Sequence, residues 1–363
     1  FIILYNFIIP YLINEIDVIN KIKVEYYPYI YIGKKIMEYT RFGASGMKVS
    51  KICFGTMMFA MEKGWRNYAL GKNDAAPVFK HALDSGINFF DTADIYSNGS
   101  CEEVTGELLN EMSNRDEIVL ATKVYNPMGK GPNQKGLSRK YIFNAIDASL
   151  SRLKMDYVDL YIIHRWDYET PIEETMEALH DVIKSGKARY IGASSMFAWQ
   201  LVKAQETAEK NGWTKFISMQ NHLNLIYREE EREMIPLCIS DDLAITPWSP
   251  LARGFLAGNR SKNGGGETDR AKNDVLADNY YYSKADFKIL DSVKKIAKKE
   301  NRKPVEVALA WLLQKKGITA PIIGPGKLEQ LKTLLNSMTL TLSKQQISSL
   351  EKHYQPKNIS GHF

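Results

Sequence analysis

Residues 88–96 read NFFDTADIY, a short apolar run that ends in Asp91 and is followed, five residues after that aspartate, by Tyr96. Two later apolar runs, IVLATK and VDLYIIH, end in Lys123 and His164. Buried strands that each end in a polar side chain are typical of a parallel α/β protein, whose site lies at the carboxyl ends of its strands. These runs therefore predict both the fold class and the place of the site.

Eight such runs follow one another along the chain, and amphipathic stretches separate most of them. The runs are 52–56, 88–92, 118–123, 158–164, 188–194, 216–221, 244–249 and 320–324. Helices are predicted near 74–85, 102–109, 139–153, 172–185, 198–211, 229–240 and 304–315. This alternation predicts an α/β fold of the (β/α)8 TIM barrel type. A turn around Gly46 predicts an N-terminal β-hairpin that closes the bottom of the barrel.

The first 36 residues differ in composition from the rest, with eleven Ile and six Tyr before Met37. Their apolar part, residues 1–13, is interrupted by Asn6 and Pro10 and is shorter than the roughly 18 residues of a membrane-spanning helix. We expect the native protein to start at Met37, with 1–36 as a non-native or disordered extension and 37–363 as a single barrel domain. A peripheral membrane segment is the alternative.

Composition limits the classes of partner. The 363 residues carry 48 Lys and Arg against 42 Asp and Glu, a net charge of +6 with both signs interspersed. This balance argues against a nucleic-acid partner and suits a small anionic ligand. Three scattered cysteines and the absence of a targeting signal favour a reducing, cytoplasmic location without membrane attachment. No His-x-His or His-Glu-x-x-His pair occurs, so no metal site is expected. The sequence gives no expectation for the oligomeric state.

The segment 254–286 is long, polar and rich in glycine. It is too long for an idle connection in a compact barrel. We interpret it as a ligand-clasping loop on the cofactor side, with a disordered insertion as the alternative.

The four polar residues at the strand ends suit proton delivery to a carbonyl group. Tyr96 is too weak an acid near neutral pH unless an adjacent ammonium, such as that of Lys123, stabilises its phenolate. Asp91 would hold the lysine in place, and His164 would hydrogen-bond the carbonyl oxygen. Each residue alone also has a structural explanation, as a helix cap, a lysine reaching solvent or a core histidine. No Gly-x-Gly-x-x-Gly follows a strand, so a dinucleotide would have to bind to the barrel itself.

Seven segments in order resemble the aldo-keto reductase family: FFDTADIY, VLATKVY, DLYIIHRWD, YIGASSM, MQNHLNLIYREEEREMIPLC, PWSPLARG and APIIGPGKLEQL. The resemblance runs from Met37 to about Tyr354. It is strongest to the bacterial subgroup sometimes named 1-deoxyxylulose-5-phosphate synthase, through HRWDYETPIEETMEAL and NLIYREEEREMIPLC.

The resemblance implies a (β/α)8 fold and NADPH-dependent reduction of aldehydes and ketones without a metal. It makes Tyr96 the proton donor and Asp91, Lys123 and His164 the rest of the catalytic set. Asp94 is a competing acid, but the family's five-residue spacing selects Asp91.

The same resemblance implies a set of contacts to NADPH or NADP. They are Gly55, Thr56 and Met57 near the ribose; Asp91, Ser194, Ser195 and Gln220 near the nicotinamide; Ser249, Leu251, Arg253 and Gly254 along the pyrophosphate; Gly324, Lys327 and Gln330 around the adenosine phosphate; and Arg260 as a further basic residue. The preference for NADP rests on Arg253, Arg260 and Lys327. Many relatives carry an acidic residue and then Asn after the Glu-Gln-Leu of this last segment, where this chain has Thr333 and Leu334.

The expected substrate is a small-molecule carbonyl compound. Four aromatic residues that follow strand ends are predicted to line its pocket: Phe59, Trp65, Tyr125 and Trp166. Two other functions stay open at this point. One is a pentose-phosphate-transforming enzyme, suggested by the subgroup name, and the other is a non-catalytic subunit that senses NADPH.

Overall fold

The computed structural model describes residues 37–61, 69–260, 274, 277 and 280–362. The predictions for residues 1–36 and for Trp65 lie outside these residues, as does most of the long segment that we interpret as a clasping loop.

Eight parallel strands form one sheet, and each of the eight predicted runs overlaps one of them. They are β3 (Cys53–Gly55), β4 (Phe89–Asp91), β5 (Val119–Val124), β6 (Val158–Ile163), β7 (Ala188–Ser194), β8 (Ser218–Gln220), β9 (Ala244–Ile245) and β10 (Ile322–Ile323). The order in the sheet is β10-β3-β4-β5-β6-β7-β8-β9. The two outer strands are joined as well, since the Ile322 N–H donates to the Pro247 oxygen at 2.9 Å and the Thr319 N–H to the Ile245 oxygen at 2.9 Å. The predicted (β/α)8 barrel is confirmed.

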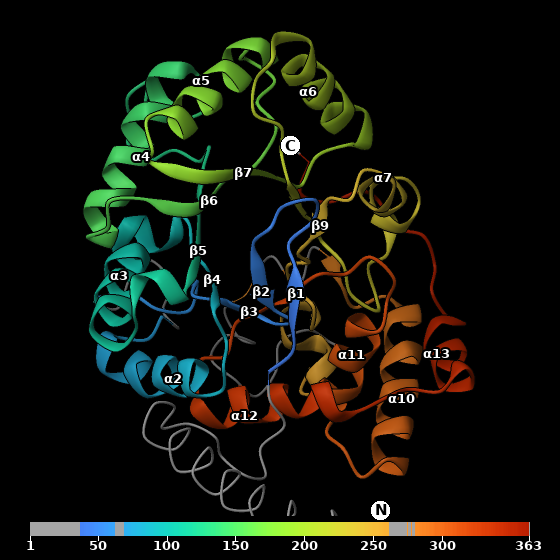
Figure 1. The fold of residues 1–363 in the computed structure, drawn as a ribbon. Coiled ribbons are helices and arrows are strands. Elements are labelled where there is room, and N and C mark those ends of the chain that lie inside the picture. Colours follow the sequence, from blue (N-terminus) through green and yellow to red (C-terminus); the bar gives the residue numbers. More distant parts are fainter. Residues whose placement is uncertain (1–36, 62–68, 261–273, 275–276, 278–279, 363) are drawn as a thin grey trace, which may run out of the picture. The chain divides into compact units, whose positions relative to one another are not determined.

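Helices surround the strands (Figure 1). They are α2 (Lys72–Asp84), α3 (Ser100–Met112), α4 (Arg139–Leu153), α5 (Ile172–Lys184), α6 (Ala198–Asn211), α7 (Met234–Ser240), α10 (Lys284–Lys299), α11 (Pro304–Leu313), α12 (Leu328–Asn336) and α13 (Lys344–Glu351). The helix predicted at 229–240 is divided into a short 3-10 helix, η3 (Glu229–Glu231), and α7. Three helices, α10, α12 and α13, were not among those predicted.

The predicted hairpin is also present. Strands β1 (Tyr39–Arg41) and β2 (Lys48–Ser50) pair in antiparallel fashion. Phe42, in the turn between them, is fully buried and meets the ring of Phe89 edge-on, with the ring centroids 5.4 Å apart. Phe42 and Val49 belong to a cluster with apolar side chains of the barrel strands, among them Leu160 and Ile162. The hairpin therefore covers the end of the barrel where the strands begin, which leaves the other end for the site.

Candidate active site

Lys123 and Asp91 form a buried ion pair at the carboxyl ends of two neighbouring strands, β5 and β4. The Lys123 side chain is inaccessible to solvent, and its Nζ donates to Asp91 Oδ1 at 2.6 Å and to the Thr92 oxygen at 2.7 Å. Burial is the largest influence and lowers the pKa of Lys123, but the interactions with Asp91 and Tyr96 together outweigh it and hold this pKa above its usual value. The lysine is therefore a fixed positive charge inside the barrel.

Tyr96 shares this lysine. It opens the 3-10 helix η1 (Tyr96–Gly99), which follows β4, and Lys123 Nζ donates to its hydroxyl oxygen at 3.3 Å. Burial raises the pKa of Tyr96, while the ammonium of Lys123 lowers it in part. The phenol thus stays protonated near neutral pH, and the ammonium is already in place for the charge that would form when the proton leaves.

His164 lies beside Tyr96, just after β6. The two rings meet edge-on with centroids 5.9 Å apart. The amide nitrogen of Asn126 lies 3.1 Å from His164 Nδ1. With this amide as the donor, Nδ1 accepts and Nε2 carries the proton. Burial, followed by the charges of Arg165 and Lys123, lowers the pKa of His164 well below its usual value, so the imidazole is a neutral donor.

Gln220 connects Asp91 to the next part of the site. Its Nε2 donates to Asp91 Oδ2 at 2.9 Å, and its backbone oxygen accepts from Ser194 Oγ at 3.0 Å. Ser195 has a left-handed backbone, with φ 46°, and its hydroxyl accepts from Trp248 Nε1 at 3.0 Å. The structure thus links three residues that the resemblance assigns to the nicotinamide, together with the carboxylate of the ion pair.

The sequence analysis did not single out Asn126 or Trp248. Asn126 lies three residues after Lys123, and Trp248 lies directly before Ser249. The position of a polar or aromatic side chain so close to a strand end is the signal that could have identified both.

The residues predicted near the ribose and the adenosine phosphate lie at two adjacent strand ends. Gly55 ends β3, and a Cβ atom placed on it would lie 2.6 Å from a side-chain carbon of Ile322 on β10, so this close approach needs a glycine. Thr56 is buried, and its Oγ1 donates to the backbone oxygen of Asp91 at 3.1 Å. Beyond β10, Lys327 is exposed at the start of α12, and the Gly326 N–H donates to Gln330 Oε1 at 2.9 Å.

Two buried arginines follow β9. Arg253 donates through Nε to both carboxylate oxygens of Asp274, at 2.8 and 2.7 Å. Arg260 Nη2 donates to the Arg253 oxygen at 2.7 Å, whereas its Nε and Nη1 have no hydrogen-bond partner among the described residues. The backbone here is left-handed at Ser249 and Gly254, as it is at Arg253. A buried guanidinium with unused donors is a suitable partner for a phosphate group.

Comparison with known proteins identifies the family. The sequence profile of the Aldo/keto reductase family matches residues 51–355. The versiconal hemiacetal acetate reductase of Aspergillus parasiticus is 42% identical over 342 residues, which cover 89% of this chain and 98% of that protein. The chain belongs to the aldo-keto reductase family. An aldo-keto reductase of Fusarium vanettenii is 40% identical (91% of this chain, 95% of that protein), and one of Metarhizium robertsii is 39% identical with the same coverage.

All three of these relatives come from fungi, and none of them carries the name of the bacterial subgroup. The comparisons thus show the family but not the subgroup, which was predicted from HRWDYETPIEETMEAL and NLIYREEEREMIPLC and stays a prediction.

The aromatic residues predicted around the substrate divide into two groups in this aldo-keto reductase. Phe59 does not line the site: it is fully buried in the core, with its ring stacked on Phe54 and edge-on to Phe79. An apolar ring that follows a short strand can turn outward under the next helix, and the sequence pattern does not distinguish the two directions. Tyr125 is part-buried after β5, and Trp166 after β6 lies next to the exposed Trp199, with ring centroids 6.1 Å apart.

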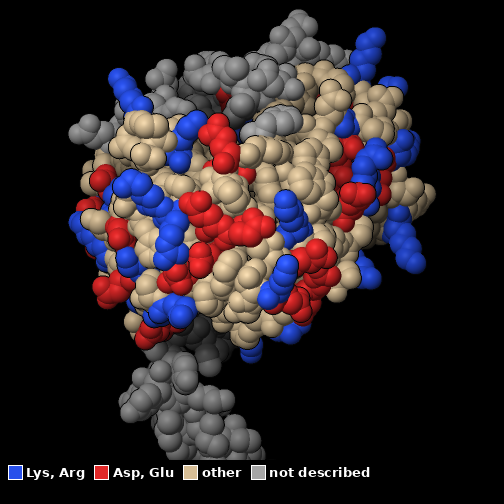
Figure 2. All heavy atoms as spheres, turned by 90° about the horizontal axis from the view of Figure 1, so that it is seen from above, with Lys and Arg blue, Asp and Glu red and all other residues tan. Residues whose placement is uncertain are grey.

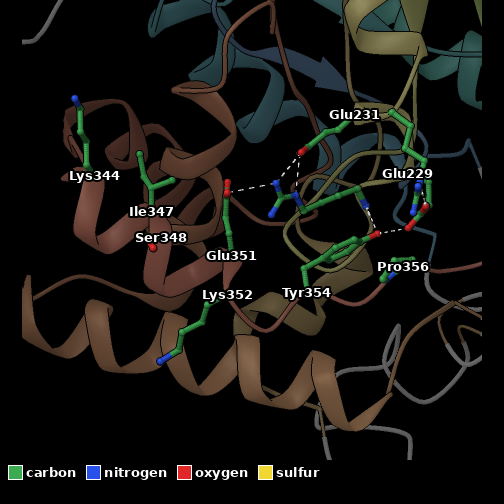
Figure 3. A pocket seen from close by; sticks show the side chains of 11 residues that line it. Glu229, Glu231, Lys344, Ile347, Ser348, Glu351, Lys352, Tyr354 and Pro356 are labelled. Carbon is green, nitrogen blue, oxygen red and sulfur yellow. Dashed lines mark hydrogen bonds and ion pairs between the residues drawn. The ribbon is translucent and has the colours of Figure 1, made fainter.

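A cavity of about 710 Å³ lies apart from the candidate site. It lies between η3 and α13 on the outside of the aldo-keto reductase barrel (Figure 3). Several of its polar groups interact with one another: Arg228 pairs with Glu231 and Glu351, and Tyr354 donates to Glu229. This network ties the C-terminal helix to the barrel.

The surface and the sulfur chemistry are ordinary. Lys and Arg are interspersed with Asp and Glu on the face in Figure 2. All three cysteines are buried and free. Within the described part of the chain, no helix is long and apolar enough to span a membrane, and no cluster of three His, Cys, Asp or Glu side chains could hold a metal ion.

Proposed function

We propose that this aldo-keto reductase reduces aldehydes and ketones to alcohols with NADPH, and that Tyr96 is the proton donor. The observation that supports the proposal most is the position of Lys123 Nζ, 2.6 Å from Asp91 Oδ1 and 3.3 Å from the Tyr96 hydroxyl. A buried lysine held by one carboxylate and one phenol is suited to lowering the cost of proton release by that phenol.

In this proposal the substrate carbonyl oxygen accepts two hydrogen bonds, from the Tyr96 hydroxyl and from His164 Nε2–H. A bound nicotinamide supplies the hydride for the carbonyl carbon. Tyr96 gives its proton to the developing alkoxide, and the positive charge of Lys123 stabilises the phenolate that remains. Asp91 keeps the lysine charged and oriented, and neutral His164 directs the carbonyl without donating a proton of its own.

The chain's residues fit a nicotinamide dinucleotide. Ser194, Ser195 and Gln220 would hold the nicotinamide, and the unused Nε and Nη1 donors of buried Arg260 would bind a phosphate. Exposed Lys327 at the start of α12 adds a second cation, and a helix N-terminus itself favours an anion. Two cations in this region support NADPH over NADH.

The substrate is a small carbonyl compound, and residues 37–363 act as one catalytic domain. The reductase name of the Aspergillus relative is in keeping with this chemistry. The bacterial subgroup remains part of the proposal and is tested with ribulose 5-phosphate, where formation of deoxyxylulose 5-phosphate would support it. A cytoplasmic location is likewise proposed.

The test is NADPH oxidation by the full chain over a panel of aldehydes, ketones and sugar phosphates, with Tyr96→Phe measured beside it. We expect wild-type turnover and a loss in the variant of about 10²- to 10⁴-fold, the usual contribution of general acid catalysis. Tyr157→Phe is the matched control, because Tyr157 lies before β6, at the end of the barrel away from the site. Full activity in Tyr96→Phe would disprove the assigned proton donor, and saturable NADPH binding without turnover would favour a sensor.

A further inference from the structure

Arg165 directly follows His164 at the end of β6 and has an unusual electrostatic position. Its Nη1 donates to the His164 backbone oxygen at 2.5 Å. Among the described residues, no carboxylate lies within ion-pair distance of its guanidinium. The nearest acid in the sequence is Asp167, whose Oδ2 instead accepts from the Leu137 N–H at 2.7 Å and from Thr170 Oγ1 at 2.7 Å.

Three other arginines that are largely withdrawn from solvent are paired with carboxylates. Arg152 lies 2.7 Å from Glu102, Arg228 lies 2.6 Å from Glu231, and Arg253 lies 2.7 Å from Asp274. These pairs follow the general rule that a buried charge needs a partner. Arg165, which is half-buried beside the candidate site, has no carboxylate partner among the described residues, a property it shares with Arg260 of the proposed phosphate site.

The surroundings of Arg165 are aromatic rather than acidic. Tyr96, Tyr125 and Tyr280 are the groups close enough to favour its charge. Burial lowers the pKa of Arg165 because it disfavours the charged guanidinium. The three neutral phenols favour the charge but do not fully compensate for burial. The same charge helps to depress the pKa of His164, in keeping with its position directly beside the catalytic set.

The cofactor does not account for this arginine. The cations that we assign to its phosphates follow β9 and β10, while Arg165 follows β6. In the order β10-β3-β4-β5-β6-β7-β8-β9, strand β6 is four places from β10 and three from β9, about as far across the ring as a strand can be. Arg165 therefore lies away from the cations assigned to the cofactor phosphates and directly follows the residue that would direct the carbonyl.

We propose that Arg165 binds an anionic group, a carboxylate or a phosphate, on the carbonyl substrate, so that the enzyme prefers anionic carbonyl compounds to neutral ones. The planar guanidinium presents paired donors that match either anion. The proposal rests on the proposed reductase function, because it places the anion next to the reacting carbonyl.

The test compares substrates with the same reacting aldehyde. They are 4-carboxybenzaldehyde, 4-formylphenyl phosphate and the neutral methyl 4-formylbenzoate, each with the wild type, Arg165→Gln and Arg165→Lys. We expect the wild type to favour at least one anion over the ester by about 10- to 100-fold in kcat/KM, the effect of one charged hydrogen-bonded pair. Arg165→Gln should bring this ratio close to one, and Arg165→Lys should restore part of it. The anion with the larger ratio identifies carboxylate or phosphate as the group.

Arg189→Gln is the matched control, since Arg189 is exposed at the start of β7, at the other end of the barrel, and its variant should keep the wild-type ratio. An equal preference in wild type, or a ratio unchanged by Arg165→Gln, would overturn the proposal.

A binding measurement keeps the proposal testable even if no aldehyde is reduced. Calorimetric titration of the NADPH-saturated full chain with benzoate and with phenyl phosphate should give a Kd at least 10-fold weaker in Arg165→Gln than in wild type. Failure of turnover together with this difference would reject the reductase function and retain the anion site. If neither benzoate nor phenyl phosphate binds to the wild type, the proposed anion site is rejected.

Discussion

The ammonium nitrogen of Lys123 lies 2.6 Å from Asp91 Oδ1 in the interior of the barrel, where both side chains are almost completely withdrawn from solvent. Each charge is tolerated there because the other is present. The pair is thus a structural element as well as a part of the site, and the two roles can be separated by mutation.

Lys123→Met should lower the free energy of unfolding by about 3–5 kcal/mol, because it leaves the Asp91 carboxylate buried without its partner. The double variant Asp91→Asn with Lys123→Met should recover much of this loss, since no charge remains, but it should stay inactive. Urea unfolding and NADPH oxidation measure the two effects. A single variant as stable as the wild type would show that the ion pair is not needed for the fold.

The reduction rate should be nearly independent of pH from about 6.5 to 9. The pKa of His164 is lowered below its usual 6.5, so the imidazole gains a proton only below the start of this range. The pKa of Tyr96 is raised above its usual 10, so the phenol loses its proton only above the end of the range. A profile of kcat/KM against pH measures this, and a fall with an apparent pKa between 7 and 9 would contradict it.

Asn126→Asp should change that profile. A carboxylate can only accept a hydrogen bond, so it would favour the tautomer with the hydrogen on His164 Nδ1 and leave Nε2 without one. We therefore expect a loss of about 10- to 100-fold at pH 8. The carboxylate would also raise the pKa of the histidine, and the imidazolium carries hydrogens on both nitrogens. Activity of the variant should therefore rise as the pH falls below about 7, unlike that of the wild type.

The barrel itself could be predicted from the sequence because its strands are buried on both faces. The run that forms β5 is apolar up to Lys123, and all six of its residues are buried. Helix α10 was missed because its polar face is rich in lysine and it adjoins a long polar segment. Its signals were present: Ser283 and Asp286 form a capping box, and Ile289 and Val293 follow at helical spacing.

The site was predictable where residues end strands and less so where loops decide the contacts. Asp91, Lys123 and His164 end runs whose carboxyl ends must meet in a barrel. Asn126 belongs to a loop, and its contact with His164 depends on the path of that loop in space. The inward or outward turn of Phe59 was not predictable for the same reason.

Arg260→Gln should weaken NADPH binding by about 10- to 100-fold, because the neutral amide cannot replace a charged donor to a phosphate. Loss of one cation should also reduce the dependence of Kd on salt concentration. Titration of intrinsic tryptophan fluorescence with NADPH measures both. Arg189→Gln is again the control, and an unchanged Kd in Arg260→Gln would remove this residue from the proposed cofactor site.

The last prediction concerns Asp94, which is fully buried close to the catalytic set. One carboxylate oxygen accepts from the Ile95 N–H at 2.6 Å, and the other has no partner among the described residues. Asp94 lines a cavity of about 180 Å³, together with Tyr141 and Arg152. Burial, and then the charge of Glu102, raises the pKa of Asp94 well above its usual value.

A carboxyl group with a raised pKa binds its proton more tightly in the folded state than in the unfolded state, where it ionises near pH 3.9. The unfolded chain therefore loses this proton first, and stability should fall as the pH rises above about 4, until the folded pKa is passed. Asp94→Asn cannot ionise and should lose this dependence, with a gain of about 1–3 kcal/mol over wild type at pH 8 and little change at about pH 4. Urea unfolding at both pH values tests the prediction, with the exposed Asp156→Asn as control. A variant less stable than wild type at pH 8 would mean that the ionised carboxylate is needed there, bound to a cation in the cavity rather than destabilised by burial.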